Sequence, residues 1–192
     1  MIAAIILAAG ESSRMGTPKA LLPFKDSTFL ESILLKVRKA KYNNIIIVLG
    51  QHYGRICRSI PIKQDHDVIR NPNPEKGQLS SLQLALKNVK DEAQGVLIVL
   101  VDHPLVSQVT YQIIYEHACA QPDAIIIPVY KNRKGHPVYF ARKFFNALIQ
   151  APLNQGARYV VHNNKSSVVE IPVEDEGIIM DIDTREQYNK IS

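Results

Sequence analysis

Two cationic residues follow the first apolar run of the chain, in the stretch LAAGESSRMGTPK at residues 7–19. Arg14 carries a planar guanidinium that suits phosphate oxygens, and Lys19 carries a compact positive charge. Ala8, Ala9 and Gly10 are small, so backbone N–H groups could approach an anionic ligand closely there. The stretch therefore predicts a loop that holds phosphate groups, with a solvated basic turn as the alternative.

The glycines of this stretch do not match the common nucleotide fingerprints. Gly10 and Gly16 are six residues apart, which differs from the dinucleotide pattern G-x-G-x-x-G. The stretch also lacks the G-K-[ST] of a P-loop. A dinucleotide-dependent oxidoreductase is therefore disfavoured.

Carboxylates that could hold a cation occur in two places. Asp102 follows the strongly apolar run GVLIVLV, and a carboxylate at the carboxyl end of a buried strand would lie in the ligand crevice. It suits Mg²⁺, which takes one or two carboxylates together with phosphate oxygens and water. Asp181 and Asp183 are two apart, so in a strand either could join Asp102. The alternatives are a turn or cap at Asp102 and a solvated turn in which Asp183 caps the last helix.

Polar residues suited to a nucleobase lie in NPNPEKGQLSSL at residues 71–82. The amide of Gln78 and the hydroxyl of Ser81 both donate and accept hydrogen bonds, as base edges require, and Gly77 lies beside them. The alternative is a loop in which Ser80 and Ser81 cap the helix that follows.

Basic residues surround a Gly-His-Pro bend in NRKGHPVYF at residues 132–140. Arg133, Lys134 and His136 could contact an anionic or heterocyclic second substrate, or belong to a surface hairpin. The segment NQGAR, which contains Arg158, leaves the same two interpretations open.

The elements that position these residues alternate between strands and helices. Runs rich in Ile and Val are apolar at consecutive positions, which is typical of parallel strands buried on both faces; they span residues 2–7, 44–49, 95–101 and 124–129. Helical spacing of apolar residues lies between them, at residues 29–40, 79–89 and 110–119. The alternation predicts an α/β fold with a mostly parallel sheet flanked by helices.

The last third of the chain has a different pattern. Short strands are expected at residues 138–140, 168–173 and 178–181, with helices at 141–150, from about 157, and at 184–190. We therefore expect a small mixed β region beside the parallel sheet, within one domain that spans residues 1–192.

Composition narrows the class of protein. The chain has 192 residues, 46% of them apolar and 21% charged, which is ordinary globular usage. A net charge of +5 suits an anionic ligand, but the basic residues are spread out, which disfavours a nucleic acid partner. Cys57 and Cys119 make no disulfide or metal-thiolate framework, so we expect a reducing cytoplasm. The first apolar run is too short to span a membrane and lacks the basic start of a signal peptide.

The chain resembles the MobA-like nucleotidyltransferases in the motifs LAAGESSRMGTPKALLP, NPNPEKGQLSSL, VDHP, KGHPVYF, QGAR and DIDT. The resemblance runs from residue 7 to about residue 184. The GHP, GAR and DIDT set is most similar to the molybdenum cofactor cytidylyltransferase (MocA-type) branch, and LAAG in place of LAGG favours CTP over GTP. The resemblance implies a Rossmann-like nucleotidyltransferase fold.

Each candidate residue has an expected role, from its chemistry or from the resemblance. Residues expected to bind the nucleotide are Leu7, Ala8, Ala9, Gly10, Arg14, Lys19, Gly77, Gln78 and Ser81. Residues expected to hold Mg²⁺ are Asp102 and Asp183. Residues expected to face the second substrate are Gly135, His136, Pro137 and Arg158. Residues expected to act in catalysis are Arg14, Lys19 and Asp102.

The reaction that the resemblance implies is transfer of CMP from CTP to the terminal phosphate of (molybdenum-)molybdopterin, with release of pyrophosphate. The product would pass to a molybdoenzyme. Two alternatives keep the chemistry: GTP with the same acceptor, or CTP with another phosphorylated acceptor. A third alternative is a non-catalytic nucleotide-binding chaperone for the cofactor, which would not need the full set of cations and carboxylates.

Overall fold

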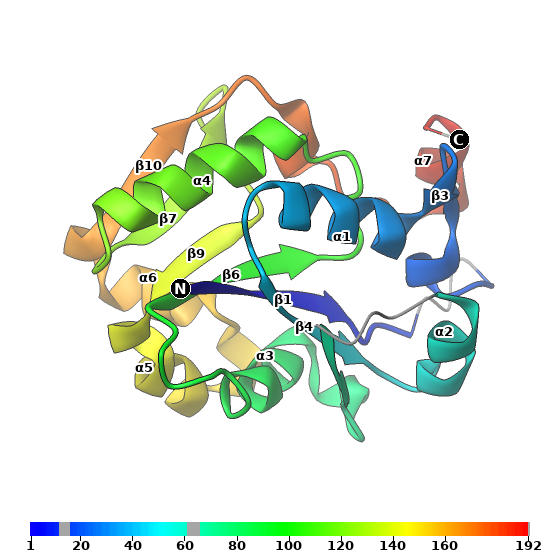
Figure 1. Ribbon diagram of the computed structural model, residues 1–192, viewed down its shortest axis with the longest axis horizontal. Helices are drawn as coiled ribbons and strands as arrows, with labels where there is room; N and C mark the ends of the chain where they lie inside the picture. Colours follow the sequence, from blue (N-terminus) through cyan, green and yellow to red (C-terminus); the bar gives the residue numbers. More distant parts are fainter. Residues whose placement is uncertain (12–15, 61–65, 192) are drawn as a thin grey trace.

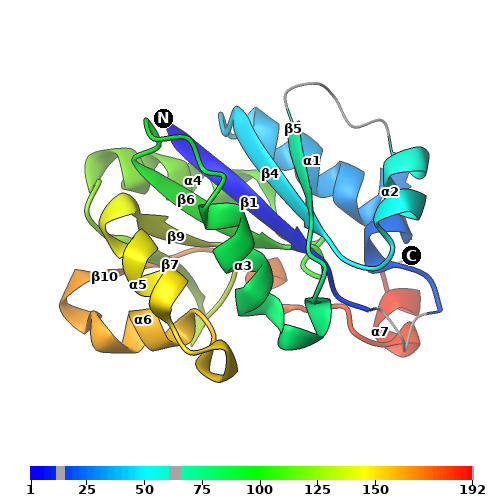
Figure 2. The ribbon, with the colours of Figure 1, turned by 90° about the horizontal axis from the view of Figure 1, so that it is seen from below.

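A central sheet with helices on both faces organises the molecule (Figures 1 and 2). The computed structural model describes residues 1–11, 16–60 and 66–191. Arg14 therefore lies outside the described residues. Within them, eight strands form the central sheet and a separate two-stranded sheet joins β2 (Pro23–Phe24) to β3 (Ser27–Thr28).

The central sheet is mostly parallel. Its order is β10-β7-β9-β6-β1-β4-β5, with β8 paired to β7. The strands are β1 (Ile2–Ala8), β4 (Asn44–Leu49), β5 (His66–Arg70), β6 (Gly95–Leu100), β7 (Ile125–Tyr130), β8 (Arg133–Lys134), β9 (Val138–Ala141) and β10 (Val168–Pro172). Strand β9 runs antiparallel to both β6 and β7. The mixed region expected near the C-terminus is thus part of this same sheet.

Helices cover the two faces of the sheet. One face carries α1 (Phe29–Lys39) and α4 (Gln108–Ala120), and the other carries α3 (Gln78–Leu86), α5 (Phe145–Gln150) and α6 (Arg158–Asn163) (Figures 1 and 2). Two short helices, α2 (Tyr53–Ser59) and α7 (Arg185–Asn189), lie toward one end of the molecule. The 3-10 turns are η2 (Lys19–Leu21), η3 (Pro74–Lys76), η4 (Arg142–Phe144), η5 (Leu153–Gln155), η6 (Lys165–Ser167) and η7 (Glu176–Ile179).

The apolar pattern explains why these elements form where they do. Every residue of β1, β4 and β6 is buried, as expected for strands covered on both faces. Helix α1 begins with a capping box in which Thr28 and Glu31 satisfy each other's backbone N–H groups. One stripe of this helix faces the core; its buried residues are Phe29, Leu30, Ile33, Leu34 and Val37.

Strand order places the site at the carboxyl ends of the central strands. The chain runs outward from β1 to β4 and β5, then returns to add β6 on the other side of β1. The carboxyl ends of β1, β4 and β6 therefore meet, because Leu7 pairs with Leu100 and Ala8 with Leu49 in parallel register. Such a reversal of strand order is where ligands bind in open α/β sheets.

The structure corrects one expected strand and adds elements that the pattern did not indicate. Residues 178–181 were expected to form a strand, but Glu176–Ile179 form the 3-10 turn η7. The carboxylate of Asp175 accepts from the N–H of Gly177 and holds that turn. Strand β5 and helix α2 were not expected, because neither has a sustained apolar run. Among the described residues, no helix has the length and apolar character needed to cross a membrane.

Candidate active site

A cavity of about 240 Å³ lies at the carboxyl ends of β1 and β6. Eight of the nine residues expected to bind a nucleotide line it; they are Leu7, Ala8, Ala9, Gly10, Lys19, Gly77, Gln78 and Ser81. The ninth, Arg14, lies outside the described residues. Asp102 also lines the cavity, and Gly50 and His52 belong to its lining, so the cavity brings together four stretches that are far apart in the sequence.

The close approach of β1 and β4 shapes one wall of this cavity. Gly50 follows β4 and lines the cavity, and a Cβ atom there would overlap the carbonyl oxygen of Ala9. Only glycine therefore lets the two strand ends lie this close. His52 lines the same wall, with Nε2 3.3 Å from the carbonyl oxygen of Glu11. Sequence analysis missed both residues, although a glycine directly after a buried strand was a usable signal.

Asn71 fixes the loop that carries the expected base-binding residues. Its side-chain amide is buried and donates to Ser81 Oγ at 2.9 Å and to Ser80 Oγ at 3.0 Å. Its Oδ1 accepts from the N–H of Asn73 at 2.9 Å, which turns the loop back toward η3. The role of Asn71 was also missed, because an Asn before Pro is typical of an ordinary turn.

The helix after this loop does not begin with the serine cap that the alternative interpretation required. The N-cap of α3 is Gly77, without a side-chain cap, and Gln78 already belongs to the helix. Ser80 donates to the carbonyl oxygen of Gly77 at 2.7 Å. Ser81 lies in the first turn, buried, so neither serine is the cap. The hydroxyl of Ser81 instead faces the cavity wall and Asn71.

Three charged residues meet beside the cavity. Lys19 Nζ lies 3.4 Å from Asp102 Oδ2 and pairs with the carboxylate of Asp183. The N–H of Ile182 donates to the carbonyl oxygen of Asp102 at 2.8 Å, which draws the C-terminal segment against the loop after β6. The spacing of Asp181 and Asp183 left open which of them would join Asp102, and the family resemblance favoured Asp183. Asp183 lies beside Asp102 in the fold, because both carboxylates face the Lys19 ammonium, whereas the side chain of Asp181 is exposed.

The alternative in which Asp183 caps the last helix is not what the structure has. Thr184 is the N-cap of α7, in a capping box with Gln187. Asp183 lies one residue earlier, so its carboxylate is available to Lys19. Asp102 is not a helix cap either, since Ser107 caps α4.

The donor chemistry at this point fits a hard divalent cation. Asp102 Oδ1 is buried and has no hydrogen-bond partner among the described residues. His103 Nε2 lies 3.9 Å from this oxygen. A buried carboxylate oxygen without a partner is costly unless a cation or water completes its contacts. Asp102 and Asp183 would together give Mg²⁺ the two carboxylates that it commonly takes, and phosphate oxygens and water would fill the other positions.

A second cavity, of about 530 Å³, adjoins the first. Leu7 and Gln78 line both cavities. Three of the four residues expected to face a second substrate line the larger one; they are Gly135, His136 and Arg158. Pro137 is buried and is not among the lining residues. The floor is apolar; it includes Leu79, Leu82, Ile98, Ile127, Val138 and Phe140.

His136 enters this second cavity as a neutral ring. Burial, together with the neighbouring ring of His103, lowers the pKa of His136 to about 4. The two ring centroids are 5.5 Å apart, and His136 Nδ1 is buried without a hydrogen-bond partner among the described residues. At neutral pH the ring can therefore donate or accept a hydrogen bond but carries no charge. The cationic side chains that line this cavity are Lys134 and Arg158.

Comparison with known proteins identifies the family of the chain. The family model described as "MobA-like NTP transferase domain" matches residues 4–168. The chain is 28% identical to the molybdenum cofactor cytidylyltransferase of Escherichia coli K12, over 96% of this chain and 92% of that protein. It is 31% identical to a Bacillus cereus protein named "Probable molybdenum cofactor guanylyltransferase", over 69% of this chain and 64% of that protein.

Solved structures share the fold of this chain. The crystal structure of Rv0371c from Mycobacterium tuberculosis H37Rv is similar with a TM-score of 0.88 and 32% identity, covering 99% of this chain and 96% of that one. A manganese complex of Rv0371c is similar with a TM-score of 0.83 and 29% identity, covering 99% and 97%. On its sequence, its fold and the residues that meet at the end of β1, this chain belongs to the MobA-like NTP transferase family and is a nucleotidyltransferase.

Proposed function

We propose that this nucleotidyltransferase transfers CMP from CTP to the terminal phosphate of a molybdopterin-type acceptor and releases pyrophosphate. The observation that carries the proposal is the pair of adjoining cavities, which share Leu7 and Gln78. A nucleotide in the smaller cavity and an acceptor in the larger one would meet at this shared wall. The similarity to a molybdenum cofactor cytidylyltransferase supports the choice of CTP and of the acceptor.

The nucleotide would lie along the carboxyl end of β1. Backbone N–H groups of the segment from Leu7 to Gly10 would face its phosphates, with Arg14 and Lys19 neutralising the triphosphate. Gly77, Gln78 and Ser81 would line the base, where the orientation of Ser81 depends on the hydrogen bond from Asn71. Gly50 keeps the strand ends close enough for this backbone to reach the ligand.

Charge stabilisation would supply most of the rate. A terminal phosphate oxygen of the acceptor attacks the α-phosphorus in line, and that oxygen is already ionised near neutral pH, so no protein base is assigned. Lys19 and Arg14 would neutralise the negative charge that grows on the leaving pyrophosphate. Asp102 and Asp183 would hold Mg²⁺, which supplies Lewis-acid stabilisation of the phosphate charge when it is bound. The existence of a manganese complex of Rv0371c supports the proposal of a divalent cation.

The acceptor side of the proposal rests on the second cavity. Its apolar floor suits a flat heterocycle, while Lys134 and Arg158 could pair with the acceptor phosphate. Gly135 and His136 would contact the ring system, and Pro137 would support them from behind. The neutral His136 would recognise the heterocycle by a hydrogen bond rather than by charge.

A second candidate keeps the mechanism and changes the base. The similarity to a protein named as a guanylyltransferase favours GTP as the alternative donor. The amide of Gln78 can pair with the edge of either base, so it does not decide between them. CTP with another phosphorylated acceptor is the remaining variant.

The cellular setting is part of the same proposal. We place the enzyme in the cytoplasm as a single MobA-like NTP transferase domain of residues 1–192, acting on small molecules. No nucleic acid or membrane partner is proposed, because the basic residues form no block in the sequence. The dinucleotide product would be handed to a molybdoenzyme.

Release of pyrophosphate tests the proposal. The full chain is incubated with Mg²⁺ and either CTP or GTP, each with and without molybdopterin cofactor. Release with CTP only in the presence of the cofactor is expected. Release with GTP instead would move the assignment to the guanylyltransferase alternative. If neither nucleotide gives release of pyrophosphate, the proposed acceptor and reaction are wrong.

A further inference from the structure

Lys36 is a partly buried lysine that the proposed chemistry does not use. It lies on α1, and its ammonium donates to the carbonyl oxygens of Pro104, at 2.6 Å, and of Val106, at 2.9 Å. Both carbonyls belong to the loop that follows β6 and carries Asp102. Charged donors make the stronger hydrogen bonds in proteins, so this lysine fixes the path of the loop immediately after Asp102.

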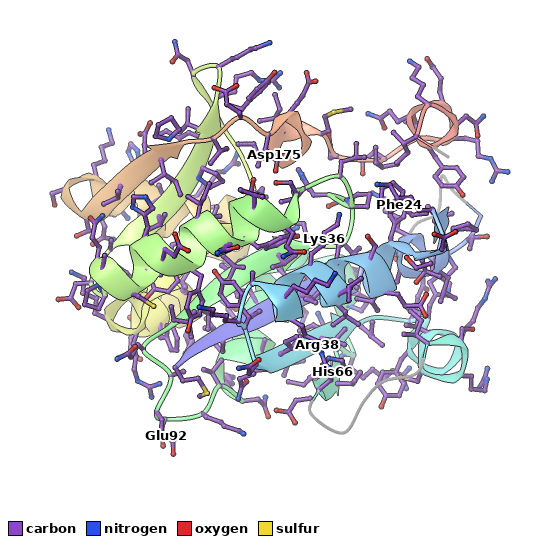
Figure 3. The ribbon with its side chains drawn as sticks, turned by 45° about the horizontal axis from the view of Figure 1, so that its top comes forward. Phe24, Lys36, Arg38, His66, Glu92 and Asp175 are labelled. Atoms are coloured by element: carbon purple, nitrogen blue, oxygen red, sulfur yellow. The ribbon has the colours of Figure 1, made fainter. Side chains whose placement is uncertain are left out.

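Asp175 holds the same loop from its other end. Its carboxylate accepts from the N–H of Ser107 at 2.8 Å and from the hydroxyl of Thr110, at the start of α4. The same carboxylate accepts from the N–H of Gly177 at 3.0 Å and so shapes η7. Figure 3 shows Lys36 and Asp175 near the same end of α4, one projecting from α1 and the other from the C-terminal segment.

The two backbone segments in contact here lie very close together. A Cβ atom at Gly177 would be 2.6 Å from the carbonyl carbon of Leu105, which leaves no room for a larger residue. The segment that starts at Asp175 then continues to Ile182, whose N–H donates to the carbonyl oxygen of Asp102 at 2.8 Å. The loop of Asp102 and the segment of Asp183 are therefore tied together at two points.

Electrostatics links the two side chains. Burial is the largest effect on Lys36 and lowers its pKa to about 8; the positive charge of Lys25 acts in the same direction, and the negative charge of Asp175 opposes both. The ring of Phe24 packs against the ammonium, 5.6 Å from centroid to Nζ. Asp175 thus stabilises the charged lysine that the two loop carbonyls need as a donor.

We propose that Lys36 and Asp175 are positioning residues for the cation site formed by Asp102 and Asp183. The inference rests on the proposed function, because it takes these two carboxylates as the cation ligands. Neither residue touches substrate or cation; each acts through backbone, Lys36 on the loop of Asp102 and Asp175 on both segments. Partners of this kind orient metal ligands, and their loss typically weakens metal binding about 10- to 100-fold.

Binding of Mn²⁺ to the full chain tests this role directly. The free ion is followed by electron paramagnetic resonance with CTP present, and binding of Mn²⁺ by CTP alone is subtracted. We expect Lys36→Met and Asp175→Asn each to weaken Mn²⁺ binding about tenfold or more. Binding of metal-free CTP, measured by calorimetry, is expected to stay at the wild-type level. Lys36→Arg should restore much of the Mn²⁺ binding, since its guanidinium can donate to both carbonyls.

Lys39→Met is the matched control, because Lys39 is exposed on the same helix. It should bind Mn²⁺ and CTP as the wild type does. Wild-type Mn²⁺ binding by folded Lys36→Met and Asp175→Asn would overturn the inference, as would equal losses of CTP and Mn²⁺ binding. If Lys36→Met does not fold, the Mn²⁺ and CTP binding of Asp175→Asn alone decides whether the inference holds.

The test separates the failure of this inference from failure of the proposed function. A wild-type chain that binds Mn²⁺ with CTP but releases no pyrophosphate contradicts the proposed reaction only. A wild-type chain that binds no Mn²⁺ overturns the cation site and the positioning role together. Normal turnover with Mn²⁺ binding unchanged in both variants overturns the positioning role only.

Discussion

The ammonium of Lys19 lies 3.4 Å from Oδ2 of Asp102 and pairs with Asp183 as well. The positive charge thus stands beside both carboxylates that would hold a divalent cation. Two cations repel strongly in a partly buried site. Binding of the metal should therefore be accompanied by movement of Lys19 toward the triphosphate, so that metal and nucleotide bind together.

Replacing Lys19 with Met should have opposite effects on the two ligands. Without nucleotide, Mn²⁺ should bind several-fold more tightly to the variant, because no ammonium competes for Asp102 and Asp183. CTP should bind more weakly, since a phosphate partner is lost. Titrations of the variant with Mn²⁺ alone and with CTP alone measure both effects, with Lys39→Met as control. Weaker binding of Mn²⁺ alone would show that the ammonium does not compete with the metal.

The two aspartates near the C-terminus provide a matched pair of substitutions. Asp183→Asn and Asp102→Asn should each lower metal-dependent turnover at least about a hundredfold, because stabilisation of several kcal/mol is lost. Asp181→Asn should leave turnover unchanged, since Asp181 is exposed. Circular dichroism would check that all three variants fold. Equal activity of the Asp181 and Asp183 variants would remove Asp183 from the cation site.

Gly50→Ala should damage the nucleotide cavity through the backbone. The added Cβ overlaps the carbonyl oxygen of Ala9, so the ends of β1 and β4 must separate. We expect a loss of about 1–3 kcal/mol in the free energy of unfolding and weaker binding of CTP. The control is Gly54→Ala in α2, where a Cβ would lie 3.5 Å from Arg58 Nη1, an ordinary contact. Urea denaturation and calorimetry compare them; matching stability and CTP affinity would rule out the steric role of Gly50.

The strands at the centre of the sheet could be predicted because consecutive apolar residues indicate a strand that is buried on both faces. The expected ranges 44–49 and 95–101 differ from β4 and β6 by at most one residue. Strand β5 could not be predicted in this way, because it lies at the sheet edge, where its residues are only half-buried or exposed, and it has no sustained apolar run.

The same distinction separates the site residues that could be predicted from those that could not. Lys19 and Asp102 carry chemistry in their own side chains and follow strands, so sequence could single them out. Gly50 and Asn71 act by close backbone approach and by a hydrogen bond across the loop, which exist only after folding. Asp183 was favoured over Asp181 by the family resemblance, whereas its pairing with Lys19 across the fold could not be read from the spacing of the residues.

His136 should make stability depend on pH. Its pKa is about 4 in the folded chain and 6.5 in the unfolded chain. Between these values the unfolded chain binds more protons, so the free energy of unfolding falls as pH drops from 6.5 toward 4. The contribution is at most about 3 kcal/mol. Urea denaturation at several pH values should show a smaller fall for His136→Asn than for the wild type.

The control for this titration is His162→Asn, because His162 is exposed. Its pH profile of stability should follow the wild type. Identical profiles for the wild type and His136→Asn would mean that His136 ionises freely in the folded chain.

Arg158→Ala should affect the acceptor and spare the nucleotide. Arg158 lines the second cavity and is not among the residues that line the first. Loss of a charged hydrogen bond costs about 1.5–3 kcal/mol, so KM for the acceptor should rise about ten- to a hundredfold. KM for CTP should stay unchanged, and exposed Lys165→Ala serves as the surface control. A rise in KM for CTP alone would place Arg158 on the nucleotide instead.

Transfer of a labelled phosphorus tests the central claim most directly. The full chain is incubated with Mg²⁺, molybdopterin cofactor and CTP carrying the label at either the α- or the γ-phosphorus, and the products are separated. The account predicts that the α-label appears in the cofactor and the γ-label in pyrophosphate. Label from the α-position recovered only as CMP or as unchanged CTP would contradict it.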